Sequence, residues 1–153
     1  MRYLEIKGMV LFVLALTVLL IPNPAPAKDL LNKTSDDLAI KGYDPVAYFT
    51  MGKPVKGSPE LQYEWIGAFW RFMSLEHRTM FEAAPEKYAP KFGGYCSYGV
   101  ATGKVLDIDP EAWKIEDGKL YLFHTKKIRE LWLGDPSVFL EEAATNWIKL
   151  QGE

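Results

Sequence analysis

The fold of this 153-residue chain is decided by the stretch Tyr63-Glu64-Trp65-Ile66-Gly67-Ala68-Phe69-Trp70-Arg71-Phe72-Met73-Ser74. Its aromatic residues favour the pleated, half-buried surface of β-strands, and Gly67 interrupts them where a tight turn would lie. We therefore predict two short antiparallel strands that meet at Gly67. Ser74 is a preferred helix N-cap, because its hydroxyl accepts a hydrogen bond from an amide of the first turn. A helix is expected to follow as far as about Ala84, before Pro85.

A second hairpin and helix are predicted closer to the C-terminus. Asp117-Gly118 is a strong hairpin signal, because both residues tolerate positive φ. Thr125 is placed to cap a helix over residues 126–133, which Gly134 ends. Pro136 then opens a last helix that runs almost to the C-terminus.

The two hairpin–helix units match without a gap when they are offset by 51 residues. The matched pairs are Gly67 and Gly118, Trp70 and Tyr121, Phe72 and Phe123, Ser74 and Thr125, Arg78 and Arg129, Met80 and Leu131, Phe81 and Trp132, and Pro85 and Pro136. An Asp-Pro-x-Ala-aromatic motif also precedes each hairpin, at residues 44–48 and 109–113. One interpretation is an internal duplication whose copies share a core, because neither buries its own face alone. The other is that two similar hairpins arose independently. In both cases we predict one α+β domain of short antiparallel hairpins packed with helices.

The remaining segments give shorter predictions. Residues 46–50 read Val-Ala-Tyr-Phe-Thr and favour a short strand. Residues 86–90 favour a single helical turn, and residues 105–108 favour a further strand. The glycine-rich, aromatic loop over residues 92–99 lets the backbone approach neighbouring segments closely.

The N-terminal residues have the pattern of an export signal. An apolar run over residues 9–21 has the length of a secretory h-region and is short for a membrane span. Ala25-Pro26-Ala27 is a small-residue cleavage signal. We therefore predict a signal peptide over residues 1–27, a flexible lead-in over 28–37 and a domain over 38–150. The expected location is periplasmic or secreted, with no stable membrane anchor after cleavage. The alternative is an uncleaved anchor.

The composition argues against some function classes. The chain carries 18 Lys and Arg against 20 Asp and Glu, a formal charge of −2 at pH 7. A nearly neutral chain without a basic stripe argues against nucleic-acid binding. The single cysteine, Cys96, has no partner for an internal disulfide. The domain must therefore depend on its core, and an aromatic content of 14% suits that requirement.

Several spaced motifs make the chain similar to YHS-domain proteins. They are residues 41–49 (Lys-Gly-Tyr-Asp-Pro-Val-Ala-Tyr-Phe), residues 63–74, Phe81, residues 85–90 and Gly93-Gly94-Tyr95-Cys96. The similarity covers about residues 38–150 and resembles the exported, single-domain branch of the family. The wider family includes metal-associated modules, some attached to transporters of copper and other heavy metals. The resemblance therefore implies a binding domain.

The chain departs from the metal-binding pattern of that family. Metal-associated members carry a cysteine in an Asp-Pro-x-Cys motif and two more after an aromatic-Phe pair. Ala47 stands at the first of these positions, and Met73 and His77 stand at the other two. The thiolate site of the family is therefore absent as such, and metal binding does not follow from the resemblance alone.

Four residues could still form a transition-metal site. Met73 and His77 offer a thioether and an imidazole near the start of one helix. Cys96 offers a thiol, and His124 matches Met73 in the second unit. Soft sulfur donors with imidazole suit copper, Cu(I) above all, so a transition metal such as copper is the leading ligand we expect. Met73 and Cys96 could instead be core residues, and the two histidines could instead bond to polar groups of the fold.

Two other function classes are open. A metal-free domain could bind a small apolar ligand or a protein partner, with aromatic residues lining its pocket. These aromatic residues are Tyr43, Tyr48, Tyr63, Trp65, Tyr95, Tyr98 and Trp113, and most of them could equally form the core. An enzyme with a Cys–His nucleophilic pair is possible, with Cys96 and either His77 or His124. The sequence singles out no Asp or Asn to orient the imidazole and no phosphate-binding glycine motif, so we assign no catalytic residue.

Processing of the N-terminus gives the first testable prediction. Cleavage after Ala27 should leave Lys28 as the first residue of the exported protein, because the small residues at 25 and 27 fit the signal peptidase. Intact-mass and N-terminal peptide analysis of protein from a secretion-competent host measures this. A mature protein that retains Met1 would contradict the prediction.

Overall fold

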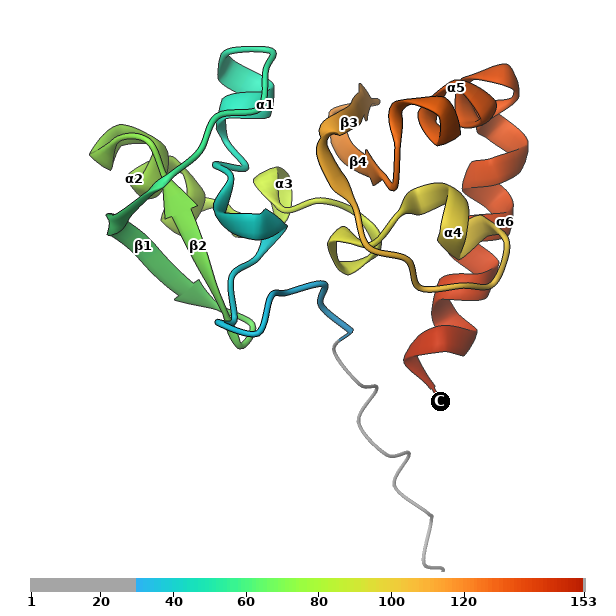
Figure 1. Ribbon diagram of the computed structural model, residues 1–153, viewed down its shortest axis with the longest axis horizontal. Coiled ribbons are helices and arrows are strands. Elements are labelled where there is room, and N and C mark those ends of the chain that lie inside the picture. Colours follow the sequence, from blue (N-terminus) through green and yellow to red (C-terminus); the bar gives the residue numbers. More distant parts are fainter. Residues whose placement is uncertain (1–29, 153) are drawn as a thin grey trace, which may run out of the picture.

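A computed structural model describes residues 30–152 of the chain (Figure 1), so the predicted signal peptide and its cleavage site lie outside the described residues. The elements are η1 (Ile40–Gly42), α1 (Ala47–Thr50), β1 (Ser58–Trp65), β2 (Ala68–Phe72), α2 (Leu75–Ala83), α3 (Pro85–Tyr88), η2 (Phe92–Gly94), α4 (Ser97–Ala101), β3 (Asp109–Glu116), β4 (Lys119–Phe123), α5 (Lys126–Gly134) and α6 (Pro136–Gln151). The strands form two antiparallel hairpins, β1–β2 and β3–β4. Together with the helices they confirm the predicted α+β fold.

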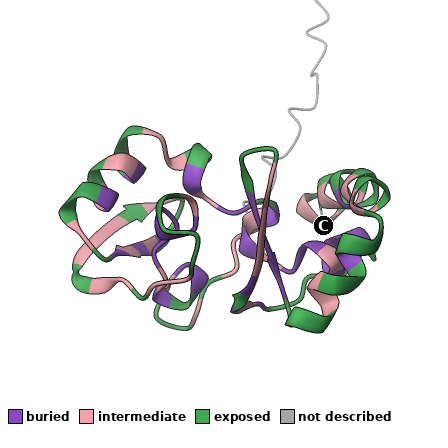
Figure 2. Cartoon of the chain, turned by 90° about the horizontal axis from the view of Figure 1, so that it is seen from above, coloured by how far each residue is buried: buried purple, intermediate pink, exposed green. Residues whose placement is uncertain are grey.

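Two hairpin–helix units lie side by side in the molecule (Figure 1). The first unit comprises residues 39–88, from η1 to α3, and the second comprises residues 91–151, from η2 to α6. In the second unit α6 packs along α4 and covers one side of the molecule. Buried segments lie inside both units, whereas the outer turns of α6 are exposed (Figure 2).

The strand registers of the two units repeat at the offset of 51. Tyr63 lies opposite Trp70 in the first hairpin, and the matching Lys114 lies opposite Tyr121 in the second. Both ladders carry a register shift at the same place, near the start of their first strand. Helices α2 and α5 also begin and end at matching residues. The structure therefore favours the internal duplication over two unrelated hairpins.

Both predicted helix caps are present. The Ser74 hydroxyl accepts a hydrogen bond from the His77 amide at 3.1 Å, and the Thr125 hydroxyl accepts one from the Ile128 amide at 3.2 Å. The final helix of each unit starts with a proline, but α3 has 4 residues and its counterpart α6 has 16. The long last helix is therefore a feature of the second unit alone.

The duplication also extends in front of the hairpins, where the offset grows to 52 residues. All three residues of η1 and of η2 have positive φ, between 48° and 80°. Gly42-Tyr43-Asp44 lies at the end of η1 as Gly94-Tyr95-Cys96 lies at the end of η2. The amides of Asp44 and Cys96 donate to the carbonyls of Val55 and Leu106, at 2.8 and 2.9 Å. Cys96 is therefore the structural counterpart of Asp44.

The sequence-based match of residues 44–48 with residues 109–113 is consequently wrong. Asp109 and Pro110 open β3, as Ser58 and Pro59 open β1. Residues 44–48 lead instead into α1. The change of offset from 51 to 52 concealed the true correspondence.

Two predicted strands are also wrong. Residues 47–50 of this segment form helix α1, because an Asp44 carboxylate oxygen accepts the amides of Val46 at 2.8 Å and Ala47 at 3.3 Å. Such a local side-chain-to-backbone bond starts a helical turn and overrides the strand preference of the following residues. Residues 105–108 form no strand, and the Ile108 amide donates to the carboxylate of Asp107 instead.

The segment over residues 30–37, which we expected as a lead-in, has hydrogen-bond partners in both units. The Asn32 amide donates to the Gly93 carbonyl, and the Lys33 ammonium donates to the Gly67 carbonyl, both at 2.8 Å. Gly93 has φ +58°, and a Cβ there would lie 2.0 Å from the Leu30 carbonyl oxygen. Only glycine therefore lets the two backbones approach this closely.

One fully buried aromatic residue lies at the centre of each unit. The Phe81 ring packs against four aromatic rings, with centroid distances of 5.0 to 6.4 Å. Its counterpart Trp132 packs against Tyr121, Phe123 and Phe139 at 5.5 to 5.8 Å. Edge-to-face and tilted aromatic pairs add to the free energy of burial. Both residues belong to the single cluster of buried residues that forms the core.

Tyr48 links the two units. Its hydroxyl donates to the Pro110 carbonyl at 3.0 Å, and its ring lies 5.3 Å from the ring of Trp113. Burial raises the pKa of the Tyr48 phenol above its ordinary value. The hydroxyl therefore stays protonated and serves as a donor between the first unit and β3.

Over residues 30–152, no helix combines the length and the apolar character that a membrane span requires.

Substitution of the central aromatic residues tests the two-unit core. Phe81→Ala and Trp132→Ala should each lower the free energy of unfolding by about 3–5 kcal/mol, the usual cost of emptying a large aromatic site. Ile148→Ala is the control, because Ile148 is 73% exposed and its truncation should change stability by less than about 0.5 kcal/mol. Denaturant titration measures all three values. A loss below about 1 kcal/mol for either aromatic residue would contradict its central place.

Candidate functional site

A buried carboxylate lies at the centre of the polar site in the first unit. Asp44 has no exposed surface. One of its oxygens accepts the amides of Val46 and Ala47. The other accepts the Met73 amide at 2.9 Å and lies 2.6 Å from Nδ1 of His77. Every one of these neighbours can donate a hydrogen bond and the backbone amides must do so, so both carboxylate oxygens act as acceptors.

His77 is oriented from both ends of its ring. Its place in the first turn of α2 follows from the Ser74 cap, which accepts the His77 amide. The Asp44 oxygen beside Nδ1 already accepts the Met73 amide, so in the arrangement that satisfies both groups it also accepts a proton carried by Nδ1. The opposite nitrogen, Nε2, lies 3.1 Å from the Thr50 hydroxyl oxygen. The side chain is 10% exposed, so the imidazole lies just beneath the surface.

Thr50 completes a chain of three side chains, Asp44–His77–Thr50. It is the last residue of α1 and is exposed. Its hydroxyl oxygen lies 3.1 Å from Nε2 of His77 and 3.1 Å from the Val46 carbonyl oxygen. A hydroxyl has one proton, so it donates to one of these two acceptors at a time. Donation to neutral His77 gives a carboxylate–imidazole–hydroxyl relay.

The second unit contains the same backbone without this relay. Cys96 replaces Asp44, and its sulfur accepts the Gly99 amide at 3.4 Å, as Asp44 accepts the amide of Ala47. Ile128 replaces His77 in the first turn of α5. Both Asp44 and Cys96 have no exposed surface. The unit therefore folds with either a charged or an apolar set of residues at these positions.

The four residues predicted to bind metal are divided between the two units. Met73 and His77 lie in the first unit, and Met73 is 40% exposed. Cys96 lies in the second unit, fully buried, and Nδ1 of His124 lies 2.9 Å from the Asp107 carbonyl oxygen. Residues 30–152 contain no group of three or more His, Cys, Asp or Glu side chains placed to hold a metal ion.

The possible cysteine–histidine pair is not among the hydrogen bonds of the described residues. His77 is bonded to Asp44 and Thr50, and the Cys96 sulfur to the Gly99 amide. Sequence reasoning did not single out Asp44 or Thr50. Asp44 lies 33 positions before His77, so no local spacing connects them. The one available signal was the Asp-Pro pair at a predicted turn, which favours an Asp side chain that bonds its own backbone.

Two adjoining cavities form a second candidate site. Each has a volume of about 420 Å³, and both are lined by Lys91, Phe92 and Trp147. The first is further lined by Leu30, Leu31, Trp65, Ile66, Trp70, Glu86, Ala89, Pro90, Gly93 and Gln151, and the second by Asp117, Lys119, Tyr121, Leu140 and Ala144. Of the seven aromatic residues expected at a pocket, Trp65 alone lines these two cavities. Phe92 and Trp147 were not predicted.

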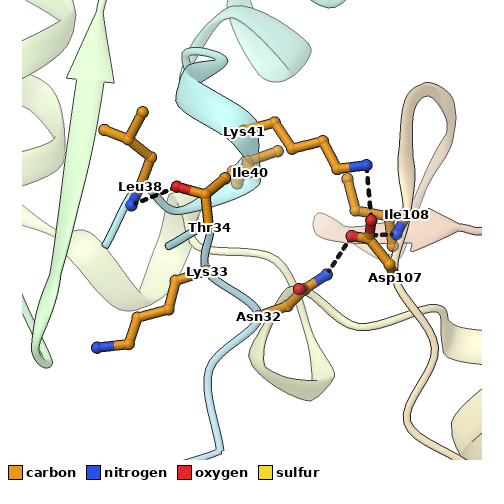
Figure 3. Close-up of a pocket in the computed structure, with 8 residues that line it drawn as sticks. All are labelled: Asn32, Lys33, Thr34, Leu38, Ile40, Lys41, Asp107 and Ile108. Carbon is orange, nitrogen blue, oxygen red and sulfur yellow. Dashed lines mark hydrogen bonds and ion pairs between the residues drawn. The ribbon is translucent and has the colours of Figure 1, made fainter. Parts of the chain in front are cut away.

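A smaller pocket of about 100 Å³ lies where the N-terminal segment meets both units (Figure 3). In Figure 3 the Lys41 and Asn32 side chains point at the Asp107 carboxylate, at 2.7 and 3.2 Å. Partial burial acts to raise the pKa of Asp107, but the hydrogen bonds from Lys41, Ile108 and Asn32 outweigh it and hold the pKa below its ordinary value. The polar groups of this pocket therefore satisfy one another and tie three segments together.

Comparison of the chain with protein-family models, curated proteins and solved structures finds no match.

Burial of Cys96 gives a prediction that separates a structural thiol from a metal ligand. A thiol without exposed surface should react with a disulfide reagent at least about 100-fold more slowly in the folded protein than in denaturant. Cys96→Ser should leave any Cu(I) stoichiometry of the wild type unchanged while lowering stability, because a buried hydroxyl replaces sulfur. Thiol labelling, Cu(I) titration and denaturant titration measure these effects. Fast thiol labelling of the folded wild type, together with loss of bound copper in Cys96→Ser, would show that Cys96 is a metal ligand.

Proposed function

We propose that this chain is a binding domain that takes a small, flat, largely apolar ligand in the two cavities beside Trp147. The observation that carries the proposal is the pair of adjoining cavities lined by aromatic rings. Ligand sites in proteins are typically concave, have volumes of about 300–1,000 Å³ and are lined by apolar and aromatic residues with a few polar groups. Each cavity falls within that range.

The aromatic walls of the cavities are held in place by packing. The Trp147 ring lies 6.0 Å from the ring of Phe92 and 6.4 Å from that of Tyr95. A Cβ at Gly93 would lie 3.1 Å from the Trp147 ring, so glycine allows α6 to approach the loop. A rigid wall lowers the entropy that a ligand must remove on binding.

Charged residues at the cavities define the polar end of the ligand. Lys91 lines both cavities, and Lys119 lines the second. Glu86 and Asp117 contribute one negative charge to each cavity. An ammonium group shared by both cavities favours a ligand with one anionic or hydrogen-bond-accepting end, which would lie near Lys91.

The resemblance to YHS-domain proteins supports a binding domain, and the export-like N-terminal sequence supports a place outside the cytoplasm. We infer a YHS-type domain that meets its ligand in the periplasm or outside the cell. A domain of this kind needs no catalytic residue for the binding function.

Copper binding is the second candidate, and one observation favours it. A metal-ligating histidine usually donates its other ring N–H to a carboxylate, which fixes the ring and its tautomer. Asp44 stands in that relation to His77 at 2.6 Å, and the neighbouring Met73 is exposed enough to add a thioether. In this candidate Met73 and His77 are the ligands, and the Cu(I) titration that tests Cys96 also tests whether copper binds at all.

Fluorescence titration with an anionic naphthalene probe, 1-anilinonaphthalene-8-sulfonate, tests the proposed cavities. Trp147→Ala should weaken probe binding at least about tenfold, equivalent to about 1.4 kcal/mol, because it removes a wall of both cavities. Lys91→Gln should weaken it less, through the sulfonate alone. Ile148→Ala is the matched control on the same helix, since Ile148 is 73% exposed, and should bind as the wild type does. Equal affinities in all three variants, with intact near-UV circular dichroism, would reject the cavities as the site.

A further inference from the structure

We propose that the Asp44–His77–Thr50 relay activates the Thr50 hydroxyl as a nucleophile, and that Thr50 accepts acyl groups from activated esters. This inference concerns residues that do not line the ligand cavities, so it does not rest on the proposed binding function. It rests on the order of the three side chains, on their burial and on the comparison between the two units.

The order of donors and acceptors is the one that a nucleophile requires. A buried carboxylate at 2.6 Å from Nδ1 fixes the imidazole tautomer in which Nε2 has a free lone pair. That nitrogen lies 3.1 Å from the Thr50 hydroxyl oxygen, within the range expected between a nucleophile and its general base. The general base is therefore oriented by a third group, as in the serine and cysteine systems that use this chemistry.

Burial decreases from the carboxylate to the hydroxyl. The Asp44 side chain is 0% exposed and the His77 side chain 10%, whereas Thr50 is exposed, as are Met51 and Gly52 after it. The Asp44 carboxyl group is thus kept from water, which would weaken its electrostatic interaction with the His77 imidazole. Thr50 is therefore the exposed end of the relay, the end from which an acyl donor would approach.

The second unit indicates that the fold does not require this relay. Thr102 follows α4 as Thr50 ends α1, and its hydroxyl also bonds a backbone carbonyl, that of Gly99, at 2.9 Å. No imidazole serves Thr102, because Ile128 stands at the position of His77 and Cys96 at that of Asp44. A hydrogen bond between a threonine hydroxyl and a backbone carbonyl is therefore common to both units. The carboxylate and the imidazole are present in the first unit only.

The proposed step balances without a cofactor. The Thr50 oxygen forms a bond to the acyl carbon of the ester, and its proton passes to Nε2 of His77. The bond from the acyl carbon to the leaving oxygen breaks, and that oxygen takes the proton from His77. The products are O-acyl-Thr50 and an alcohol or phenol, and Asp44 stabilises the imidazolium that forms in between.

Acetylation by p-nitrophenyl acetate, followed by peptide mass spectrometry, tests the inference. In the wild type the rate of acetylation at Thr50 should exceed that at Thr102 at least about 100-fold, the lower bound for positioned general-base catalysis. This comparison is made within one folded molecule, so it does not depend on the folding of any variant. Equal acetylation of the two threonines, or none at Thr50, would overturn the proposal.

Variants then connect the reactivity to the relay. His77→Gln should lower the rate of acetylation at Thr50 at least about 100-fold. Thr50→Ala should abolish acetylation at residue 50, because it removes the hydroxyl. Thr50→Ser should retain it, because serine keeps a hydroxyl at that position. Thr102→Ala is the matched control and should leave the Thr50 rate unchanged. An unchanged rate at Thr50 in folded His77→Gln would show ordinary surface reactivity and overturn the role of the imidazole.

Discussion

The first unit depends on one buried carboxyl group. Asp44 joins three parts of the chain, since its carboxylate accepts amides from the start of α1, the amide of Met73 after β2, and the imidazole of His77 in α2. Burying an unpaired charge is costly, and the cost falls only when each oxygen is hydrogen-bonded. The positions of α1, the β2 end and α2 are therefore coupled through a single side chain. Loss of any one of these donors would leave the buried carboxylate with fewer hydrogen bonds, which would weaken the contacts it makes with the remaining donors.

The second unit holds the corresponding turn, strand end and helix in place with other residues. Cys96 caps the corresponding turn through its sulfur, and Ile128 stands at the position that matches His77. The two units also differ at their last helix, where α6 extends far beyond the length of α3 and carries Trp147. The two units thus present two different surfaces. The first unit carries the polar relay, and the second builds most of the aromatic cavities.

Much of the fold could be predicted from local signals. The turn at Gly67, the Asp117-Gly118 turn and the Ser74 and Thr125 caps each act through backbone geometry within a few residues, and all four are present. Helix α1 could not be predicted, because residues 46–50 have strand preference and the deciding interaction is the Asp44 cap. The full extent of the duplication was hidden for another reason, since an offset that changes from 51 to 52 defeats a gapless comparison.

The candidate site could be predicted only in part. His77 was singled out for its chemistry, but its partners Asp44 and Thr50 are 33 and 27 positions away and come together only in the folded unit. Soft donors alone suggested a metal site, and the fold separates Cys96 and His124 from Met73 and His77 by placing them in different units.

The comparison of the two units also bears on why the charged pair is present. Replacing a buried, hydrogen-bonded polar group by well-packed apolar residues of similar shape can be nearly neutral or stabilising. This chain contains both solutions on one backbone, with Asp44 and His77 in one unit and Cys96 and Ile128 in the other. Stability alone therefore gives no reason for the carboxylate and the imidazole. What the carboxylate–imidazole pair provides, and the Cys96–Ile128 pair does not, is an imidazole with a fixed tautomer whose Nε2 lies 3.1 Å from the hydroxyl oxygen of the exposed residue Thr50. The chemistry of that nitrogen is the property that distinguishes the first unit from the second.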